Sequence, residues 1–162
     1  MTISKNIIAL TGALLVAGGL GGWMVSRKLV ERSSPVPTTL GVSDGQLTPC
    51  PDSPNCVSTQ AIDEEHSIPP IPYTMPLNEA RTLMLEIVGS LPGTEISMVS
   101  ANYIHAVTRT RVFAFIDDTE IYMDDDAKLI HIRAAARLGY GDMGVNRRRA
   151  ETIIEKFKDM GR

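Results

Sequence analysis

Five arginines surround a glycine-rich loop near the C-terminal end of the sequence. Arg133 and Arg137 precede this loop, and Arg147, Arg148 and Arg149 follow it. The surrounding pattern predicts a strand, a loop and the start of an amphipathic helix. Such a junction can bind an anion, because guanidinium groups and the free amides of a helix N-terminus donate hydrogen bonds to negative charge. The residues expected at this ligand-binding site are Tyr103, His105, Glu120, Arg133, Arg137, Asp142, Asn146, Arg147 and Arg149.

Titratable side chains alternate with apolar ones in three segments upstream of the loop. Tyr103 and His105 share one phase of an expected strand, Asp118 and Glu120 that of the next, and Arg133 that of a third. Because successive side chains of a strand point to opposite faces, a meander gathers these polar groups on one face. Such a face is ordinarily the solvated side of an antiparallel sheet. Catalysis by His105 with Asp118 or Glu120, as in a small hydrolase, is the alternative.

Two further chemical patterns are weaker. Asp118 and Glu120 share a face and could offer oxygen ligands to Ca²⁺ or Mg²⁺, but pairing with Arg109 or Arg133 would satisfy the same carboxylates. Residues 139–144, Gly-Tyr-Gly-Asp-Met-Gly, have the G-x-G-x-x-G spacing. A dinucleotide-binding unit needs another strand after the helix, and no strand-like segment follows here. We therefore expect no metal and no other cofactor.

The elements that position these side chains form a small α+β domain. A helix is expected after Thr74, which can cap it, and it ends at Pro92-Gly93. The period then changes from helical to two, which predicts four strands. Short connections favour an antiparallel four-stranded sheet with flanking helices in the order α-β-β-β-β-α. The expected strands are 95–100, 103–109, 119–124 and 128–135, and the final helix is 143–160. Residues 110–117 either extend the second strand or cross over.

An uncharged run of 19 residues, Ile7–Val25, precedes the domain. As a helix it spans about 28 Å, close to the ~30 Å hydrocarbon core of a bilayer. Lys5 precedes the run, and Arg27 and Lys28 follow it, as is common at lipid headgroups. We favour a single-pass membrane anchor formed by residues 7–25 within an N-terminal segment, 1–28. A cleaved signal peptide is the alternative.

A proline-rich segment separates this run from the domain. Nine of the ten prolines fall between Pro35 and Pro76. Residues 29–48 have little apolar periodicity, so we expect an extended spacer, followed by a globular domain at 49–162. The positive-inside rule weakly favours a cytoplasmic domain. The cysteines favour the opposite, a periplasmic or other extracytoplasmic location.

The two cysteines, Cys50 and Cys56, flank a short loop with two prolines. A local disulfide is the favoured interpretation and implies an oxidising compartment. Two buried free thiols are the second interpretation. A metal or nucleophilic role is the third, and it lacks the spacing and additional ligands of a zinc site.

The charge distribution argues against nucleic acid as a partner. Beyond residue 33 the chain carries 12 lysines and arginines against 18 aspartates and glutamates. An acidic domain is a poor general binder of phosphate backbones. The arginines around the loop are therefore a local feature.

Several separated motifs resemble those of a bacterial and plastid family, domain-of-unknown-function family 1499. The matching stretches are Cys50–Ser58 (CPDSPNCVS), Tyr103–Ala106, Phe115–Asp118, Glu120–Tyr122, Ile130–Arg133 and Arg137–Arg149 (RLGYGDMGVNRRR). They cover residues 48–158. Ala134–Ala136 and Gly141 depart from the family, which commonly has serine there. The resemblance implies an envelope or membrane-associated setting and no defined activity.

Three functions follow from these patterns. We favour a non-catalytic, membrane-anchored envelope domain that binds a small anion, a lipid headgroup or an acidic partner through the arginine-rich site. The second is the hydrolase that uses His105. The third is a scaffold that presents a protein-binding surface on the anchor and spacer.

Overall fold

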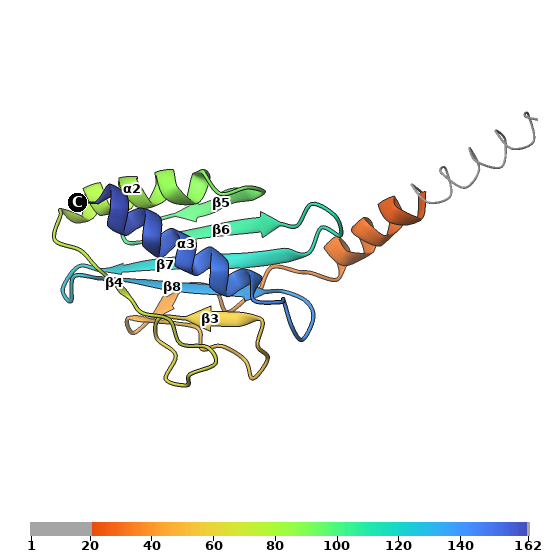
Figure 1. Ribbon diagram of the computed structural model, residues 1–162, viewed down its shortest axis with the longest axis horizontal. Helices are drawn as coiled ribbons and strands as arrows, with labels where there is room; N and C mark the ends of the chain where they lie inside the picture. Colours follow the sequence, from red (N-terminus) through yellow and green to blue (C-terminus); the bar gives the residue numbers. More distant parts are fainter. Residues whose placement is uncertain (1–20, 162) are drawn as a thin grey trace, which may run out of the picture.

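The computed structural model describes residues 21–161 of the chain (Figure 1). Residues 21–32 form a helix that extends from one end of the domain. Within the described part, no helix combines the length and apolar character needed to cross a bilayer. Most of the expected membrane span, residues 7–25, lies outside the described residues.

The main sheet is antiparallel and has six strands in the described part of the chain, not the expected four. The strands are β3 (Cys56–Ser58), β4 (Ile71–Pro72), β5 (Thr94–Val99), β6 (Tyr103–Arg109), β7 (Ile116–Asp124) and β8 (Leu129–Ala136). Their order is β3-β8-β7-β6-β5, and β4 also pairs with β8. The α+β class is confirmed. The two additional strands come from the proline-rich region, where they are too short to produce an alternating pattern.

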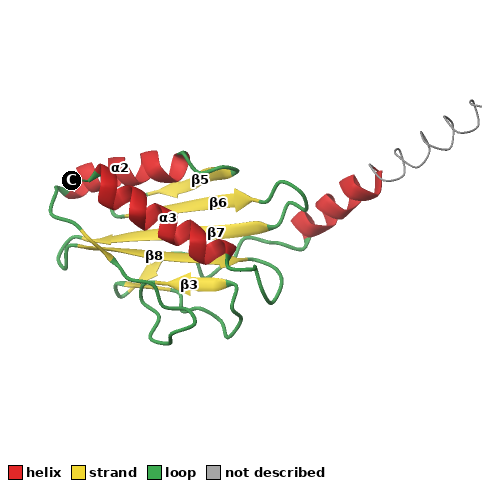
Figure 2. Ribbon diagram, viewed as in Figure 1, coloured by secondary structure: helices red, strands yellow, loops and turns green. Residues whose placement is uncertain are grey.

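Two helices cover one face of this sheet. Figure 2 shows α2 (Leu77–Gly89) and α3 (Val145–Met160) on the same side of the strands. Apolar side chains of β6, β7 and β8 alternate toward them, and Ile104, Ile121 and Ile132 are fully buried there. This is the expected apolar face. The helix after Thr74 is also present, but its N-cap is Pro76, so the predicted threonine cap is wrong.

Most of the expected spacer covers the opposite face of the sheet. Residues 34–49, which we call the strap, contain the hairpin of β1 (Val42–Ser43) and β2 (Gln46–Leu47). The side chain of Leu47 is buried, and its backbone amide donates to Gln60 Oε1 at 2.8 Å. The expectation of an extended spacer therefore does not describe the strap, which packs on the domain.

Three segments meet at one end of the molecule. The β6–β7 connection, the β8–α3 connection and the helix of residues 21–32 lie at the same end in Figure 1. Residues 110–115 form the first connection, because β7 begins at Ile116. We call residues 110–115 and 138–144 together the loop end.

Candidate functional site

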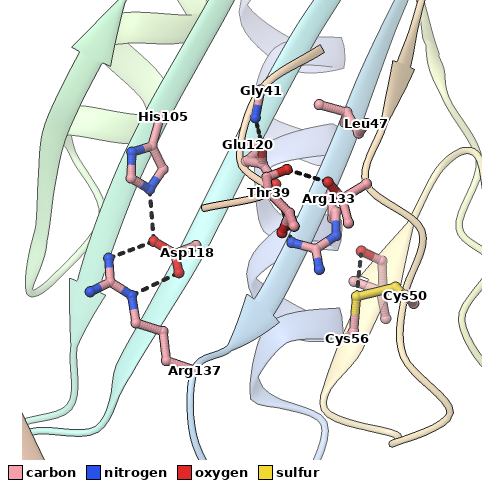
Figure 3. A network of polar contacts seen from close by, with 12 residues as sticks. Thr39, Gly41, Leu47, Cys50, Cys56, His105, Asp118, Glu120, Arg133 and Arg137 are labelled. Carbon is pink, nitrogen blue, oxygen red and sulfur yellow. Dashed lines mark hydrogen bonds and ion pairs between the residues drawn. A yellow bond between two sulfur atoms is a disulfide. The ribbon is translucent and has the colours of Figure 1, made fainter. Parts of the chain in front are cut away.

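A buried charge cluster lies between the sheet and the strap. Asp118 accepts two hydrogen bonds from Arg137, both at 2.8 Å, and is 2.7 Å from His105 Nε2 (Figure 3). Arg137 also donates to the backbone carbonyl of Ser34 in the strap. Burial opposes ionisation of Asp118, but the hydrogen bonds from Arg137 and His105 outweigh it and hold the pKa of this carboxyl below its ordinary value.

A second carboxylate on the same strand anchors the strap. Glu120 accepts hydrogen bonds from Tyr103 Oη at 2.8 Å, Arg133 Nη1 at 3.1 Å and the Gly41 backbone amide at 2.8 Å. The strap crosses directly over this carboxylate in Figure 3. Burial raises the pKa of Tyr103, and the charge of Glu120 raises it further. The tyrosine therefore stays a neutral donor to the carboxylate.

The strand register produces this arrangement. His105, Glu120 and Arg133 lie opposite one another on β6, β7 and β8. The expected polar face is thus confirmed as a face, but it is not solvated. His105, Asp118 and Glu120 are each less than 5% exposed. A hydrolase substrate could reach the buried His105–Asp118 pair only after the residues that cover it had moved.

Asp117 forms a separate ion pair on the helix-covered face. Its Oδ2 accepts a hydrogen bond from Arg149 Nη2 at 2.7 Å, and Arg149 also donates to Asn146 Oδ1. Asn146 in turn donates to the backbone carbonyl of Asn55. Burial raises the pKa of Asp117, although Arg149 partly opposes this effect.

The carboxylate of Asp142 lies at the start of α3. Asp142 accepts hydrogen bonds from the amides of Gly144 at 2.9 Å and Asn146 at 2.7 Å. The Asn146 amide is one of the first-turn amides of α3 that an anion would use. Arg147 donates to the carbonyls of Ser67 and Glu65.

The nine residues expected at one site therefore fall into separate places. Tyr103, His105, Glu120, Arg133 and Arg137 lie together beneath the strap. Asn146 and Arg149 lie on the helix-covered face with Asp117, and Arg147 contacts the β3–β4 connection. Asp142 accepts two backbone amides at the start of α3, whose N-cap is Gly144. The described structure gives each of the four arginines an acceptor within the protein.

Two contributors to these clusters were not expected from the sequence. In the alternating pattern of its strand, Asp117 falls on the apolar face. A buried acidic side chain needs a partner there, so this position in the pattern could have identified Asp117. Gly41 contributes a backbone amide, which no side-chain pattern reveals. Asp117 belongs to residues 110–117 and Gly41 to the expected spacer, and the sequence assigned neither segment to a strand of the sheet.

A small pocket opens at the loop end. Its volume is about 130 Å³, and its lining includes Thr110, Phe115, Asp117, Leu138, Gly139 and Asp142. The walls are mainly apolar, with two carboxylates among them. This is the point where β7, β8 and the start of α3 converge.

The two connections of the loop end carry large exposed apolar side chains, which we call the apolar rim. They are Val112, Phe113, Phe115, Tyr140 and Met143. Met143 is 94% exposed and has a positive φ of 56°, a conformation that is costly for a residue with a side chain. The protein therefore holds an apolar side chain in solvent at a conformational cost.

The N-terminal helix is attached to the same loops. Trp23 Nε1 donates to the carbonyl of Val112 at 2.8 Å, and Arg27 donates to the carbonyls of Arg111 and Val112. The guanidinium of Arg27 also lies 4.9 Å from the centre of the Trp23 ring. These contacts hold the helix beside the β6–β7 loop.

The disulfide is confirmed. Cys50 and Cys56 are bonded, and their Cα atoms are 5.7 Å apart. The bond joins the residue that follows the strap to the first residue of β3. It therefore fixes the C-terminal end of the strap at the edge of the sheet.

The comparison with protein families agrees with the resemblance seen in the motifs. Residues 46–157 match a family model described as a protein of unknown function (DUF1499). The match covers well over half of the chain and includes β3 to β8 and nearly all of α3. No curated protein matches the sequence.

Proposed function

We propose that this chain, which belongs to the family of proteins of unknown function DUF1499, is a membrane-anchored, non-catalytic domain that binds lipid headgroups with its loop end. The observation that carries the proposal is the group of exposed apolar side chains on two loops beside the N-terminal helix. Soluble surfaces scatter such side chains singly, whereas a gathered set indicates a binding surface.

The N-terminal sequence supplies the anchor in this proposal. The uncharged run from Ile7 to Val25 is long enough to span a bilayer as a helix, and Arg27 and Lys28 follow it. Trp23 then lies at the depth where tryptophan is enriched in membrane proteins. Because Trp23 and Arg27 contact the carbonyls of residues 111 and 112, the β6–β7 loop lies close to the headgroups.

The loop end has the composition of an interfacial surface. Phe113 and Phe115 form a tilted aromatic pair with ring centres 6.1 Å apart, and Tyr140 and Met143 extend from the second loop. Full burial of one large apolar side chain is worth about 1.5–3 kcal/mol. Partial insertion of several such side chains, added to an anchor, is therefore sufficient to orient the domain on the membrane.

The charge clusters have a structural role in this account. The strap and the helices cover the carboxylates, and each carboxylate is paired with an arginine. An anion at these arginines would have to displace a protein carboxylate. Of the three expected ligand classes, the lipid headgroup is therefore favoured over a free anion or an acidic partner.

The domain faces an oxidising compartment in this proposal. The Cys50–Cys56 bond supports an extracytoplasmic location, because such bonds are rare in the cytosol. In a bacterial envelope this is the periplasmic side of the membrane. Arg27, Lys28 and Arg32 follow the apolar run and favour a cytoplasmic domain by the positive-inside rule, but these charges are few.

The test is amide hydrogen exchange of the full chain in lipid nanodiscs. We compare the wild type with Phe113→Ser/Tyr140→Ser, using Ile62→Ser as the control, because Ile62 is fully exposed on the β3–β4 connection. Exchange at residues 110–115 and 138–144 is expected to be about tenfold faster in the double variant only. Equal exchange in all three proteins would contradict the proposal. A scaffold that needs a protein partner would give that equal result in protein-free bilayers.

A further inference from the structure

The loop-end pocket is too small for a whole ligand. Typical ligand pockets have volumes of about 300–1,000 Å³, whereas this one measures about 130 Å³. It can take only a terminal group of a few atoms, with the rest of the ligand outside. A lipid headgroup at the loop end has this form, so the inference rests on the proposed function.

The charges around the pocket favour a cation. Asp117 and Asp142 line it, and Arg149, behind Asp117, is the cation that pairs with the Asp117 carboxylate. Oδ1 of Asp117 accepts no hydrogen bond from the described residues, although the residue is only 3% exposed. A carboxylate oxygen that accepts no hydrogen bond, in the lining of a pocket, is suited to an ammonium donor.

The same pocket disfavours an anion. The amides of Gly144 and Asn146 donate to Asp142 and are not available to a ligand. An incoming phosphate would meet two carboxylates at short range and would be repelled. The phosphate of a bound lipid must therefore stay outside, near the exposed side chain of Arg148.

The apolar wall adds a second element of recognition. Phe115 lines the pocket and is 40% exposed. The face of an aromatic ring attracts an ammonium group by about 0.5–2 kcal/mol. Leu138 and Val145 complete an apolar surface that suits methylene or methyl groups.

We infer that the loop-end pocket binds the ammonium group of an aminoethyl or choline lipid headgroup, between the carboxylates of Asp117 and Asp142 and the ring of Phe115. The pocket would then select lipids that carry a terminal ammonium over anionic lipids. The apolar rim would bind any bilayer, and the pocket would add the selectivity.

A pair of ligands of the same shape tests this inference. Choline and its uncharged counterpart 3,3-dimethylbutan-1-ol are titrated into the full chain in a maltoside detergent at constant ionic strength. The backbone amide NMR signals of Gly139 and Gly141 report binding. Choline is expected to bind at least tenfold more tightly than the neutral alcohol. Equal binding of the two, or binding of neither, would overturn the inference.

Conservative variants locate the charge that is responsible. Asp117→Asn keeps an acceptor for Arg149, and Asp142→Asn keeps one acceptor for the amides at the start of α3. Each is expected to weaken choline binding about tenfold and leave the neutral alcohol unchanged. Asp126→Asn, on the exposed turn at the far end of β7, is the control. Wild-type affinity for choline in both pocket variants would overturn the inference.

The two proposals can fail separately. If residues 110–115 and 138–144 are protected by a bilayer but choline binds no better than the alcohol, lipid binding stands and the ammonium pocket is rejected. If choline binds selectively but the bilayer leaves the loops unprotected, the ammonium pocket stands and the membrane orientation is rejected.

Discussion

Asp117 and Asp118 are neighbours in the sequence, yet they form ion pairs on opposite faces of the sheet. Asp118 pairs with Arg137 beneath the strap, and Asp117 pairs with Arg149 beneath α3. Strand geometry produces this division, because adjacent side chains point to opposite faces. One strand thus fixes the strap on one side and the start of the last helix on the other.

The Asp118 pair predicts a loss of stability in acid. The folded-state pKa of Asp118 lies below the ordinary value of 3.8, so its contribution is complete above that pH and is lost as the pH falls through the folded-state pKa. Asp118→Asn is expected to lower the free energy of unfolding by about 3–5 kcal/mol at pH 7, because Arg137 is left without its carboxylate. Urea unfolding of both proteins from pH 7 to about pH 2.5 measures the difference. It should shrink below pH 3.8, and a difference that grows in acid would contradict this assignment.

Asp117 has the opposite pH dependence. Burial raises its pKa in the folded state, so the folded protein binds more protons than the unfolded chain just above pH 3.8. Its contribution therefore falls as the pH rises through this window. Asp117→Asn is expected to destabilise the protein less than Asp118→Asn at pH 7 in the same urea titration. An equal or larger loss of stability for Asp117→Asn would contradict this order of the two ion pairs.

The Glu120–Arg133 pair is expected to be structural. Arg133→Met alone should lower the free energy of unfolding by about 3–5 kcal/mol, because it leaves a buried carboxylate. Combining it with Glu120→Met should recover part of that loss, and the double-mutant cycle measures the coupling. If Arg133→Met leaves stability unchanged and alters only ligand binding, the expected anion site at Arg133 would regain support.

The disulfide is expected to control the strap. Replacing both cysteines with alanine removes a loop closure of seven residues, worth about 2 kcal/mol by chain entropy. Hydrogen exchange at the Gly41 amide, which donates to Glu120, should accelerate more than exchange in β7. Uniform acceleration across the sheet would show that the strap unfolds only with the whole domain.

The exposed conformation of Met143 predicts a conflict between stability and function. Met143→Gly relieves a positive φ and is expected to raise the free energy of unfolding by about 0.5–1 kcal/mol, after the entropy of glycine is subtracted. The same change removes an apolar side chain from the loop end. The variant should therefore unfold at a higher temperature, yet its loops should be less protected from exchange in nanodiscs. A lower free energy of unfolding in this variant would mean that Met143 packs within the protein.

The parts of the fold with clear periodicity could be predicted from the sequence. The expected strand 103–109 coincides with β6, and the apolar phase of β7 and β8 correctly identified the face that the helices cover. Strands β3 and β4 have three and two residues, too few for alternation to be visible. The prolines of β4 and of the strap are also typical of a linker. In the structure β4 pairs with β8, and the strap packs on the sheet.

The candidate site was harder to predict, because its partners depend on the topology. The arginines do surround one loop, as the sequence indicates, but the pattern did not show which face each side chain would reach. Arg137 pairs with Asp118 and Arg149 pairs with Asp117. The two arginines therefore lie on opposite sides of the sheet, because the two aspartates point to opposite faces. The apolar rim was also not predicted, because Phe113 and Phe115 belong to residues 110–117, which the sequence left open between a strand extension and a crossover.

The depth of the loop end in a bilayer decides whether this surface binds the membrane. Phe113→Trp in a Trp23→Phe background gives the full chain a single tryptophan at the β6–β7 loop, since Trp23 is the only tryptophan present. Ile62→Trp in the same background is the matched control, because Ile62 is fully exposed and belongs to the β3–β4 connection, outside the loop end. Brominated lipids should quench the fluorescence of the Phe113→Trp protein strongly and leave that of the Ile62→Trp protein unaffected. Equal, weak quenching of both proteins would contradict the proposal that the loop end faces the membrane.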